Sequence, residues 1–378
     1  MPPIYQLPRR NAGKSPPPLS FIFNPPNLLY SYCVLTDLTL LPSSDPTSVY
    51  RYRDGLYAAD LLTTALVHLD LFTWIDANPG SSLEKISHHF NIHPRPTDVM
   101  LTLFVAMELL LRQGSDYKLT TLGREFLTRS SHWDIAPYFA SLKERPVCKD
   151  FLHILQTNKT ANWGSYKDEK DWHKAMETPE FAKNFTAAMD CRGVYLAAAL
   201  ARKIDCRNHA RLLDIGGGSG IYACSFVAHY SHLTATVFEK SPVDRIARDS
   251  ISSRGFSDRV NALPGDLFHQ PLPPGYDLHL ISNVLHDWDL PEVKRIVKTS
   301  AESISPRGML IVHDAFLNRE KTGPLPVAAY STLLMHSTEG RCYSIAEIES
   351  VLAEFGFAQF TFHETAADRG AITAIMHS

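Results

Sequence analysis

The stretch "LLDIGGGSG", residues 212–220, decides the fold of this chain. Its first four residues have strand character and carry one acid, Asp214, while four of its last five residues are glycine. A chain omits side chains at this density where a ligand or another segment must come very close to its backbone. We therefore expect a strand that ends in a ligand-binding loop.

From Ala210 onward, short apolar segments alternate with helical stretches. The segments are "RLLDI" (211–215), "ATVFE" (235–239), "DLHLISNVL" (277–285) and "MLIVHDA" (309–315). Strands at this spacing are typical of βαβ units in a doubly wound parallel sheet. Ligands of such sheets bind beyond the carboxyl ends of the strands, so the glycines are expected to line that crevice.

The spacing of the glycines indicates a nucleoside ligand without a pyrophosphate. A dinucleotide fingerprint would place a glycine at position 221, where this chain has Ile221, and the lysine of a phosphate-binding P-loop is missing. Glu239 ends the second strand, where an acid can bind both hydroxyls of a ribose. In "PGDLF" (264–268), Asp266 is placed to bind an adenine edge, with Leu267 and Phe268 packing on the ring.

Composition narrows the class of protein. A chain of 378 residues favours two domains. A net charge of −3 gives no electrostatic footprint for nucleic acid or an anionic membrane, and no apolar run reaches the roughly 20 residues of a spanning helix. The six cysteines contain no C-x-x-C pair, which is typical of a reducing compartment. We expect a cytoplasmic enzyme with no metal, membrane or nucleic-acid partner.

The N-terminal part divides into two regions. Residues 1–47 are rich in proline and are expected to form a mobile extension without chemistry. Residues 48–175 show helical periodicity, with expected helices in "YAADLLTTALVHLDLFTWI" (57–75) and "RPTDVMLTLFVAMELLLRQG" (95–114), then a hairpin and helix in "DYKLTTLGREFL". This order outlines a winged helix and raises the alternative of a DNA-binding regulator. The second helix has almost no polar face for reading bases, which argues against that alternative.

Four blocks carry a family resemblance. "LLDIGGGSG", "PGDLF", "NVLHDWD" (283–289) and "TEGRCYSIAEIESVLAEFGF" (338–357) resemble, in order and spacing, the S-adenosylmethionine-dependent small-molecule O-methyltransferases of the plant caffeic acid, acetylserotonin and microbial secondary-metabolite type. The resemblance covers roughly residues 50 to 378. It implies a winged-helix dimerisation domain at 48–175, hence a homodimer, and a Rossmann-like catalytic domain at 176–378. It also implies a cofactor site formed by Asp214, Gly216, Gly218, Glu239, Asp266, Leu267, Phe268 and Asn283.

The resemblance implies that His286 is the general base. Methyl transfer to an alcohol or phenol requires removal of the hydroxyl proton, and a histidine of pKa ~6.5 can accept it where a phenol of pKa ~10 stays protonated. Asp314 ends the next strand and is expected to orient the imidazole, in a position where plant members carry Glu. Asp287 is expected to cap the following helix rather than take part in chemistry.

One departure from the family pattern concerns a second acid. Cys342 occupies the place where plant members carry that acid. Glu339 lies three residues upstream, and the sequence leaves open whether it reaches His286.

The sulfonium of the cofactor loses its charge during transfer, so a dry, apolar and aromatic substrate wall is expected. We assign the wall to Phe181, Phe185, Met189, Met335 and His336, which favours aromatic acceptors. A non-methylating reaction that uses the bound cofactor electrostatically, for pericyclic or decarboxylating chemistry, is the alternative. Retention of His286 and Asp314 favours methyl transfer.

Overall fold

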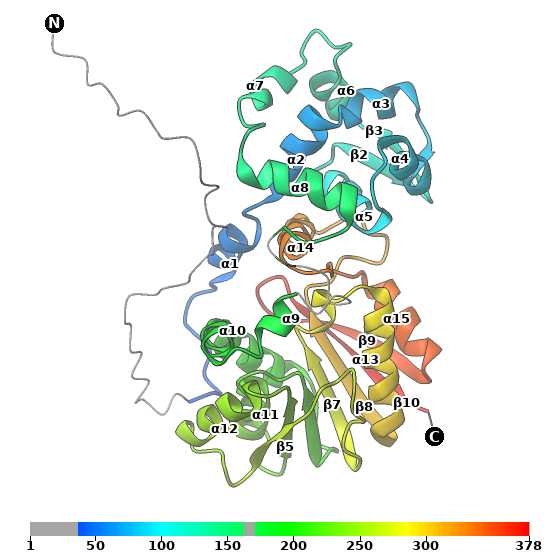
Figure 1. Cartoon of the computed structure of the whole chain (residues 1–378). Helices are drawn as coiled ribbons and strands as arrows, with labels where there is room; N and C mark the ends of the chain where they lie inside the picture. The colour runs from blue at the N-terminus through cyan, green and yellow to red at the C-terminus, as the bar shows by residue number, and fades with distance from the viewer. Residues whose placement is uncertain (1–36, 162, 164–170, 378) are drawn as a thin grey trace, which may run out of the picture. The chain divides into compact units, whose positions relative to one another are not determined.

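The computed structural model describes residues 37–161, 163 and 171–377 (Figure 1). Most of the predicted extension at 1–47 therefore lies outside the described residues. Within its described part, Leu38 is buried in the same core cluster as Leu196 and Leu200. The boundaries at 47 and 175 stay predictions.

The N-terminal region is helical with a small sheet. Its elements are α1 Thr47–Asp54, α2 Ala58–Thr63, the π-helix η1 Thr64–His68, α3 Leu71–Ala77, β1 Ser81–Ser82, α4 Leu83–Phe90, α5 Pro94–Ala106, β2 Leu110–Gln113, β3 Asp116–Leu119, α6 Thr121–Leu127, α7 Ala136–Ala140 and α8 Pro146–Thr157. The three strands pair antiparallel in the order β1-β3-β2. Helices α4 and α5 followed by the β2–β3 hairpin have the order of a winged helix.

Two helices expected from periodicity are shorter than predicted. The helix at 57–75 is interrupted, because η1 ends at His68 and Asp70 then adopts a left-handed backbone with φ 51°. The helix at 95–114 ends at Ala106, because Glu108 is left-handed with φ 60° and residues 110–113 pair with β3 instead. The prediction was too long because a run of apolar residues fits both a buried helix and a buried strand, so the pattern alone does not show where the helix ends.

The C-terminal region contains α9 Trp172–Ala175 and α10 Pro179–Lys203, followed by a seven-stranded sheet. The strands are β4 Arg211–Ile215, β5 Thr234–Glu239, β6 Val260–Pro264, β7 Tyr276–Ser282, β8 Ile304–Asp314, β9 Phe357–Glu364 and β10 Gly370–Met376, in the order β6-β5-β4-β7-β8-β10-β9. Strands β4 to β8 are parallel, as expected, but β10 runs antiparallel to β8 and β9. The short link between β9 and β10 has no room for a crossover helix, so the sheet is mixed rather than wholly parallel.

Helices cover both faces of this sheet (Figure 1). One face packs against α10, α11 Ile221–His229 and α12 Val243–Ser253, and the other against α13 Leu290–Ser303 and α15 Ile345–Glu354. The strand order reverses at β4, which lies between β5 and β7. Ligands of doubly wound sheets bind at this switch point, beyond the carboxyl ends of the strands.

Helix α14, Leu325–Ser337, belongs to the C-terminal half of the sequence but packs with the N-terminal helices. Its Val327, Ala328 and Met335 are buried in one core cluster with Met100 and Leu103 of α5. Buried residues, most of them apolar, lie on all sides of α14, as expected for a helix that is covered all round. The two halves of the sequence therefore share a hydrophobic core.

A cluster of ion pairs adds a second connection between the halves. Lys321 Nζ lies 2.5 Å from Asp98 Oδ2 of α5 and 3.2 Å from Glu347 Oε1 of α15. Arg341 contacts the same two acids, at 3.4 and 2.8 Å. Burial raises the pKa of Glu347, but Arg341 and Lys321 outweigh burial and lower it to about 2.

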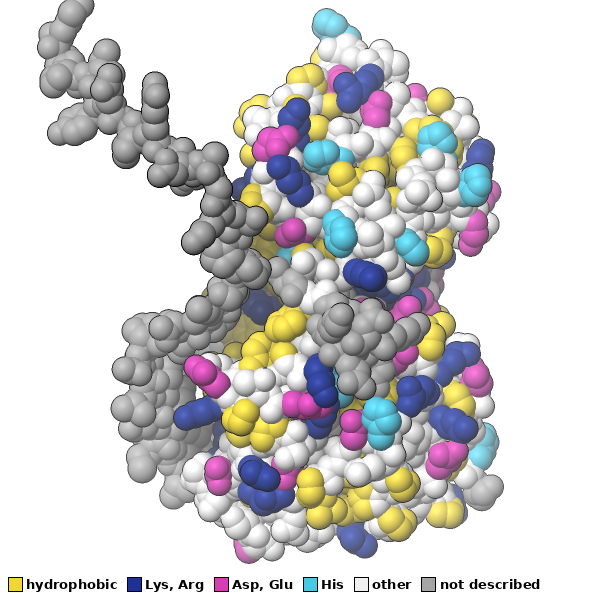
Figure 2. All heavy atoms as spheres, viewed as in Figure 1, with side chains coloured by type: hydrophobic (Ala, Val, Ile, Leu, Met, Phe, Trp, Pro, Cys, Tyr) yellow, Lys and Arg dark blue, Asp and Glu magenta, His cyan; other side chains and the backbone are white. Residues whose placement is uncertain are grey.

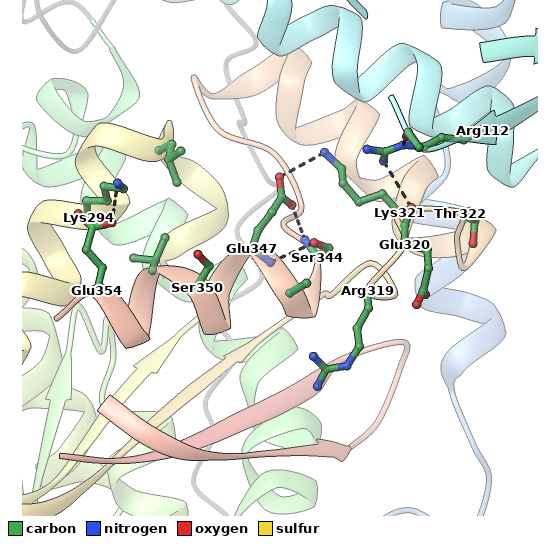
Figure 3. A pocket seen from close by; sticks show the side chains of 14 residues that line it. Arg112, Lys294, Arg319, Glu320, Lys321, Thr322, Ser344, Glu347, Ser350 and Glu354 are labelled. Carbon is green, nitrogen blue, oxygen red and sulfur yellow. Dashed lines mark hydrogen bonds and ion pairs between the residues drawn. The ribbon is translucent and has the colours of Figure 1, made fainter. Parts of the chain in front are cut away.

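A surface groove of about 760 Å³ borders this cluster (Figure 3). Three of its four cations, Lys294, Arg319 and Lys321, pair with Glu354, Glu349 and Glu347, while Arg112 donates to backbone carbonyl groups. On the face shown in Figure 2, cationic and acidic side chains are interspersed. Among the described helices, no single one is long and apolar enough to span a membrane, while the bent pair Thr47–His68 and Leu71–Ala77 reaches that length and composition together.

Replacing Asp98 by alanine is expected to lower the free energy of unfolding by about 3 kcal/mol, because it leaves two largely buried cations sharing one acid. Urea denaturation measures this loss. Asp76→Ala is the matched control, since its partner Arg124 is exposed and such a pair contributes at most about 1 kcal/mol. Equal effects of the two substitutions would refute a stabilising role for the cluster.

Candidate active site

The loop after β4 approaches its surroundings without side chains. Gly216 and Gly218 have left-handed backbones, with φ of 67° and 57°, which glycine adopts without strain. A Cβ on Gly216 would lie 3.1 Å from Val284 Cγ2, and one on Gly217 would lie 2.5 Å from the Asp214 carboxyl group. A Cβ on Gly218 would meet no atom of the described residues within 4 Å. The loop is thus closely packed at Gly216 and Gly217 and leaves open space at Gly218, as a cofactor-binding loop requires.

Asp214 is a fully buried acid beneath this loop. Neither carboxylate oxygen has a hydrogen-bond partner of good geometry among the described residues. Burial raises the pKa of Asp214 to about 7; Glu239 adds to the rise and the N–H of Ala223 opposes it. Buried polar atoms are nearly always hydrogen-bonded, so these two oxygens fit a ligand that donates hydrogen bonds.

Glu239 lies at the end of β5 and connects directly to the loop. Its Oε2 accepts a hydrogen bond from Gly218 N at 2.9 Å, and its Oε1 accepts one from Lys240 N at 2.8 Å. Burial raises the pKa of Glu239, while these two N–H groups oppose the rise. A carboxylate oxygen has a second lone pair, so each can still accept a hydrogen bond from a ribose hydroxyl.

The "GD" acid and the two residues after it lie on the neighbouring strand end. Asp266 Oδ1 accepts from Phe268 N at 2.9 Å, and its Oδ2 lies 3.2 Å from His269 Nδ1. Leu267 faces the loop, 3.9 Å from where a Cβ on Gly216 would stand. Phe268 instead packs edge-on against Trp288, with ring centroids 4.6 Å apart.

Asn283 follows β7 with a left-handed backbone, φ 54°. Its side-chain amide donates to Tyr222 Oη and Ser282 Oγ, each at 3.0 Å, while Oδ1 is buried without a partner among the described residues. The cofactor residues expected from the sequence thus lie at the ends of β4, β5, β6 and β7. Asp214, Glu239 and Asn283 present buried polar atoms suited to a nucleoside ligand, so the residues present fit the expected cofactor. The role of each residue stays a prediction.

His286 and Asp314 lie in direct contact at the ends of β7 and β8. His286 is in the short 3-10 turn Leu285–Asp287, is 3% exposed, and hydrogen-bonds Asp314 Oδ1 through Nδ1. Ala315 N also donates to Asp314 Oδ1, at 2.7 Å. Because the carboxylate accepts the proton of Nδ1, the other ring nitrogen, Nε2, is free to act as a base.

Asp287 does not cap the next helix, contrary to our prediction. The cap of α13 is Asp289, whose Oδ1 accepts from Leu290 N at 2.8 Å. Asp287 Oδ1 lies 3.7 Å from His286 Nε2 instead. Of the two acids in "HDWD", Asp287 therefore faces the imidazole, and Asp289 stands at the N-cap position of α13.

Asp314 and Asp287 favour the charged form of the His286 imidazole. Burial lowers the pKa of His286, but Asp314 and Asp287 outweigh burial and raise it above the ordinary value. Burial raises the pKa of Asp287 to about 6, with His286 opposing the rise. His313, adjacent to Asp314, hydrogen-bonds Ser282 Oγ and Thr365 Oγ1, on the other side of the strand.

The segment around Gly340 runs against the backbone of His286. A Cβ on Gly340 would lie 2.0 Å from the carbonyl oxygen of His286, so only glycine fits. The carbonyl of Gly340 accepts from Arg95 Nη1 at 2.9 Å, and Glu339 interacts electrostatically with Arg95 and Asp171. Burial raises the pKa of the Cys342 thiol, and Asp314 adds to the rise, so Cys342 stays a neutral thiol. Participation of Glu339 in catalysis stays a prediction.

The expected substrate wall falls into two groups. On α10, Phe185 stacks with Trp172 and Phe181, at centroid distances of 5.6 and 6.0 Å, and Met189 is half-buried one turn further on. On α14, Met335 is fully buried in the shared core, and His336 Nε2 lies 3.0 Å from Asp150 Oδ2 of α8. Contact of either group with a substrate stays a prediction.

Two residues near His286 were missed by the sequence analysis. The ring of Tyr330 lies edge-on to the imidazole, with centroids 5.7 Å apart and an interplanar angle of 81°. Arg192 Nη1 donates to Tyr330 Oη at 3.2 Å. Arg192 stands one turn after Met189 on α10. Its helical spacing from the expected substrate wall could have indicated from the sequence that it lies near the site.

This geometry agrees with the comparisons with known proteins. A family model for the O-methyltransferase domain matches residues 156–358. The chain belongs to this O-methyltransferase family. It is 24% identical over 314 residues to a 3-hydroxy-5-methyl-1-naphthoate 3-O-methyltransferase of Streptomyces sahachiroi, an alignment that covers 83% of this chain and 90% of the relative.

Solved structures share the fold. A Planctomyces limnophilus O-methyltransferase family 2 protein in complex with apigenin has a TM-score of 0.80 and 27% identity, over 90% of this chain and 98% of that one. Human N-acetylserotonin methyltransferase in complex with S-adenosylmethionine has a TM-score of 0.56 and 21% identity, over 90% and 100%. The predicted family, enzyme class and cofactor, S-adenosylmethionine, are thereby confirmed. Within the described residues, no group of three His, Cys, Asp or Glu side chains is arranged to hold a metal.

Replacing Glu239 by glutamine is expected to weaken binding of S-adenosylhomocysteine by about 10-fold or more, because a charged hydrogen-bond acceptor for the ribose is lost. Titration calorimetry measures the affinity. Glu364→Gln, at the exposed end of β9, is the matched control and should leave it unchanged. Unchanged affinity in Glu239→Gln would remove Glu239 from the cofactor site.

Proposed function

We propose that this protein transfers the methyl group of S-adenosylmethionine to the hydroxyl of a small aromatic secondary metabolite, with His286 as general base and Asp314 as its orienting acid. The single observation that carries the proposal is the buried contact between His286 Nδ1 and Asp314, on the same sheet edge as the glycine loop. An aromatic acceptor is supported by two related proteins: one is named for a hydroxynaphthoate, and the other contains apigenin.

The chain's own residues account for the proton transfer. S-adenosylmethionine, when bound, supplies a methyl group activated by its sulfonium. His286 Nε2 accepts the proton of the acceptor hydroxyl, since Nδ1 is already engaged by Asp314. The imidazolium that forms is stabilised by Asp314 on one nitrogen and by Asp287, 3.7 Å from the other. The low exposure of His286 keeps water from competing for the proton.

The same arrangement disfavours the non-methylating alternative. A pericyclic or decarboxylating reaction does not need a base held by two acids at the position where a hydroxyl must be deprotonated. Release of S-adenosylhomocysteine in the presence of a panel of phenols, followed by mass spectrometry, tests the proposal directly.

We also propose a homodimer that forms through the N-terminal region. The proposal follows the family resemblance, and large apolar side chains are exposed in this region. They include Leu56, Leu111, Leu122, Trp133, Tyr138 and Leu142. A cytoplasmic location stays a prediction.

His286→Ala is expected to lower kcat by roughly 10²–10⁴-fold while the affinity for S-adenosylhomocysteine stays within error. Steady-state kinetics and titration calorimetry give the two values. His363→Ala, at a partly exposed histidine on β9, serves as control and should retain full activity. A parallel loss of cofactor affinity in His286→Ala would show that His286 supports the structure instead.

The acid side of the pH profile reports the pKa of the base. Because the acids beside His286 raise its pKa in the free protein, kcat/KM is expected to fall as pH drops through a value above ~6.5. Asp287→Asn removes one of the acids that raise this pKa, so the fall should move to lower pH. Asp289→Asn, at the α13 cap, should not move it. An unchanged profile in Asp287→Asn would exclude His286 as the titrating base.

A further inference from the structure

Arg192 places a cation beside the proposed base. It lies on α10, where the adjacent Gly193 packs so closely on Ile221 that a Cβ would stand 2.5 Å from Ile221 Cγ2. Arg192 Nη1 donates to Tyr330 Oη at 3.2 Å, and the ring of Tyr330 lies edge-on to His286. A short chain of contacts therefore connects this guanidinium to the imidazole.

The guanidinium of Arg192 is not in direct contact with an acid of the described residues. Within the described part of the chain, Arg192 forms no ion pair, and its Nε is buried without a hydrogen-bond partner. Arg369 differs in this respect: it packs over the ring of Tyr330, 4.5 Å from the ring centroid, and pairs with Asp54 at 2.9 Å. A buried cation without a counter-ion is costly, so an anionic ligand would stabilise Arg192.

The free edge of the guanidinium suits a carboxylate. Tyr330 occupies Nη1, which leaves Nε and Nη2. Two adjacent N–H groups of arginine bind the two oxygens of a carboxylate in parallel.

The position of Arg192 points to the acceptor rather than to the cofactor. Its contact partner is Tyr330 of α14, whose ring lies 5.7 Å from the imidazole of His286. Tyr330 is not one of the expected cofactor residues. Arg192 therefore reaches the base through a side chain outside the expected cofactor site.

We propose that Arg192 binds a carboxylate of the acceptor, so that the preferred substrates are hydroxylated aromatic acids. This inference rests on the function proposed above, and makes Arg192 a residue that determines specificity rather than one that takes part in the proton transfer. Its role is to fix the distance and direction of the hydroxyl relative to His286 by holding the other end of the acceptor.

The test compares acids with neutral analogues of the same shape. Isomeric hydroxynaphthoates and the corresponding carboxamides are titrated into protein saturated with S-adenosylhomocysteine, and are then assayed with S-adenosylmethionine. We expect the wild-type protein to bind at least one acid more than 10-fold more tightly than its amide. Arg192→Gln should raise the Kd and KM of that acid about 10- to 100-fold and leave those of the amide and kcat within 3-fold.

Two further variants separate charge from packing. Arg192→Lys keeps the charge and should recover part of the affinity for the acid, while Arg202→Gln, at the exposed end of the same helix, should behave as wild type. Equal weakening of acid and amide binding by Arg192→Gln, with no recovery in Arg192→Lys, would reduce Arg192 to a packing role and overturn the proposal.

The cofactor also carries a carboxylate, which Arg192 could bind in place of the acceptor's carboxylate. Cofactor-binding measurements on Arg192→Gln distinguish the two. If Arg192→Gln weakens binding of S-adenosylhomocysteine but not of 5′-methylthioadenosine, which lacks the carboxylate, the acceptor assignment is wrong. Absence of methyl transfer together with Arg192-dependent binding of an acid would overturn the proposed function alone. Wild-type binding of acids and amides with equal affinity would overturn this inference alone.

Discussion

The contact between His286 and Asp314 depends on the order of the strands. His286 follows β7 and Asp314 ends β8, and these two strands are parallel neighbours, so both residues emerge at the same sheet edge. The same edge carries the glycine loop after β4, the other neighbour of β7. One topological fact, the position of β7 between β4 and β8, thus brings the cofactor loop and the proposed base together.

The low exposure of this edge makes its charges effective. Interactions between ions strengthen as water is excluded, so Asp314 and Asp287 can raise the pKa of a buried imidazole that burial alone would lower. Arg192 and Arg369 add positive charge around Tyr330; among the described residues Arg369 pairs with Asp54, while Arg192 forms no ion pair. The environment of the base therefore combines two acids beside the imidazole with a cation that reaches it through Tyr330.

The N-terminal helices contribute to this environment through α14. This helix carries Tyr330 toward His286 and at the same time packs into the core formed by α2, α3 and α5. Arg95 of α5 binds the carbonyl of Gly340, in the segment that runs against the backbone of His286. Residues of the N-terminal region thus contact two of the segments that surround the base.

Local signals are sufficient to predict the α/β sheet, the glycine loop at 216–220, and the strand ends that carry Glu239, His286 and Asp314, because short apolar runs at βαβ spacing and the positions of glycines are read directly along the chain. Tertiary packing decides that Asp287 faces the imidazole, that β10 runs antiparallel to β8 and β9, that α14 joins the N-terminal core, and that Arg192 forms no ion pair among the described residues. These features depend on how helices distant in the chain pack on one another. Apolar periodicity shows that a helix is buried, but not against which partner, and the charge balance of a buried site is set by that partner.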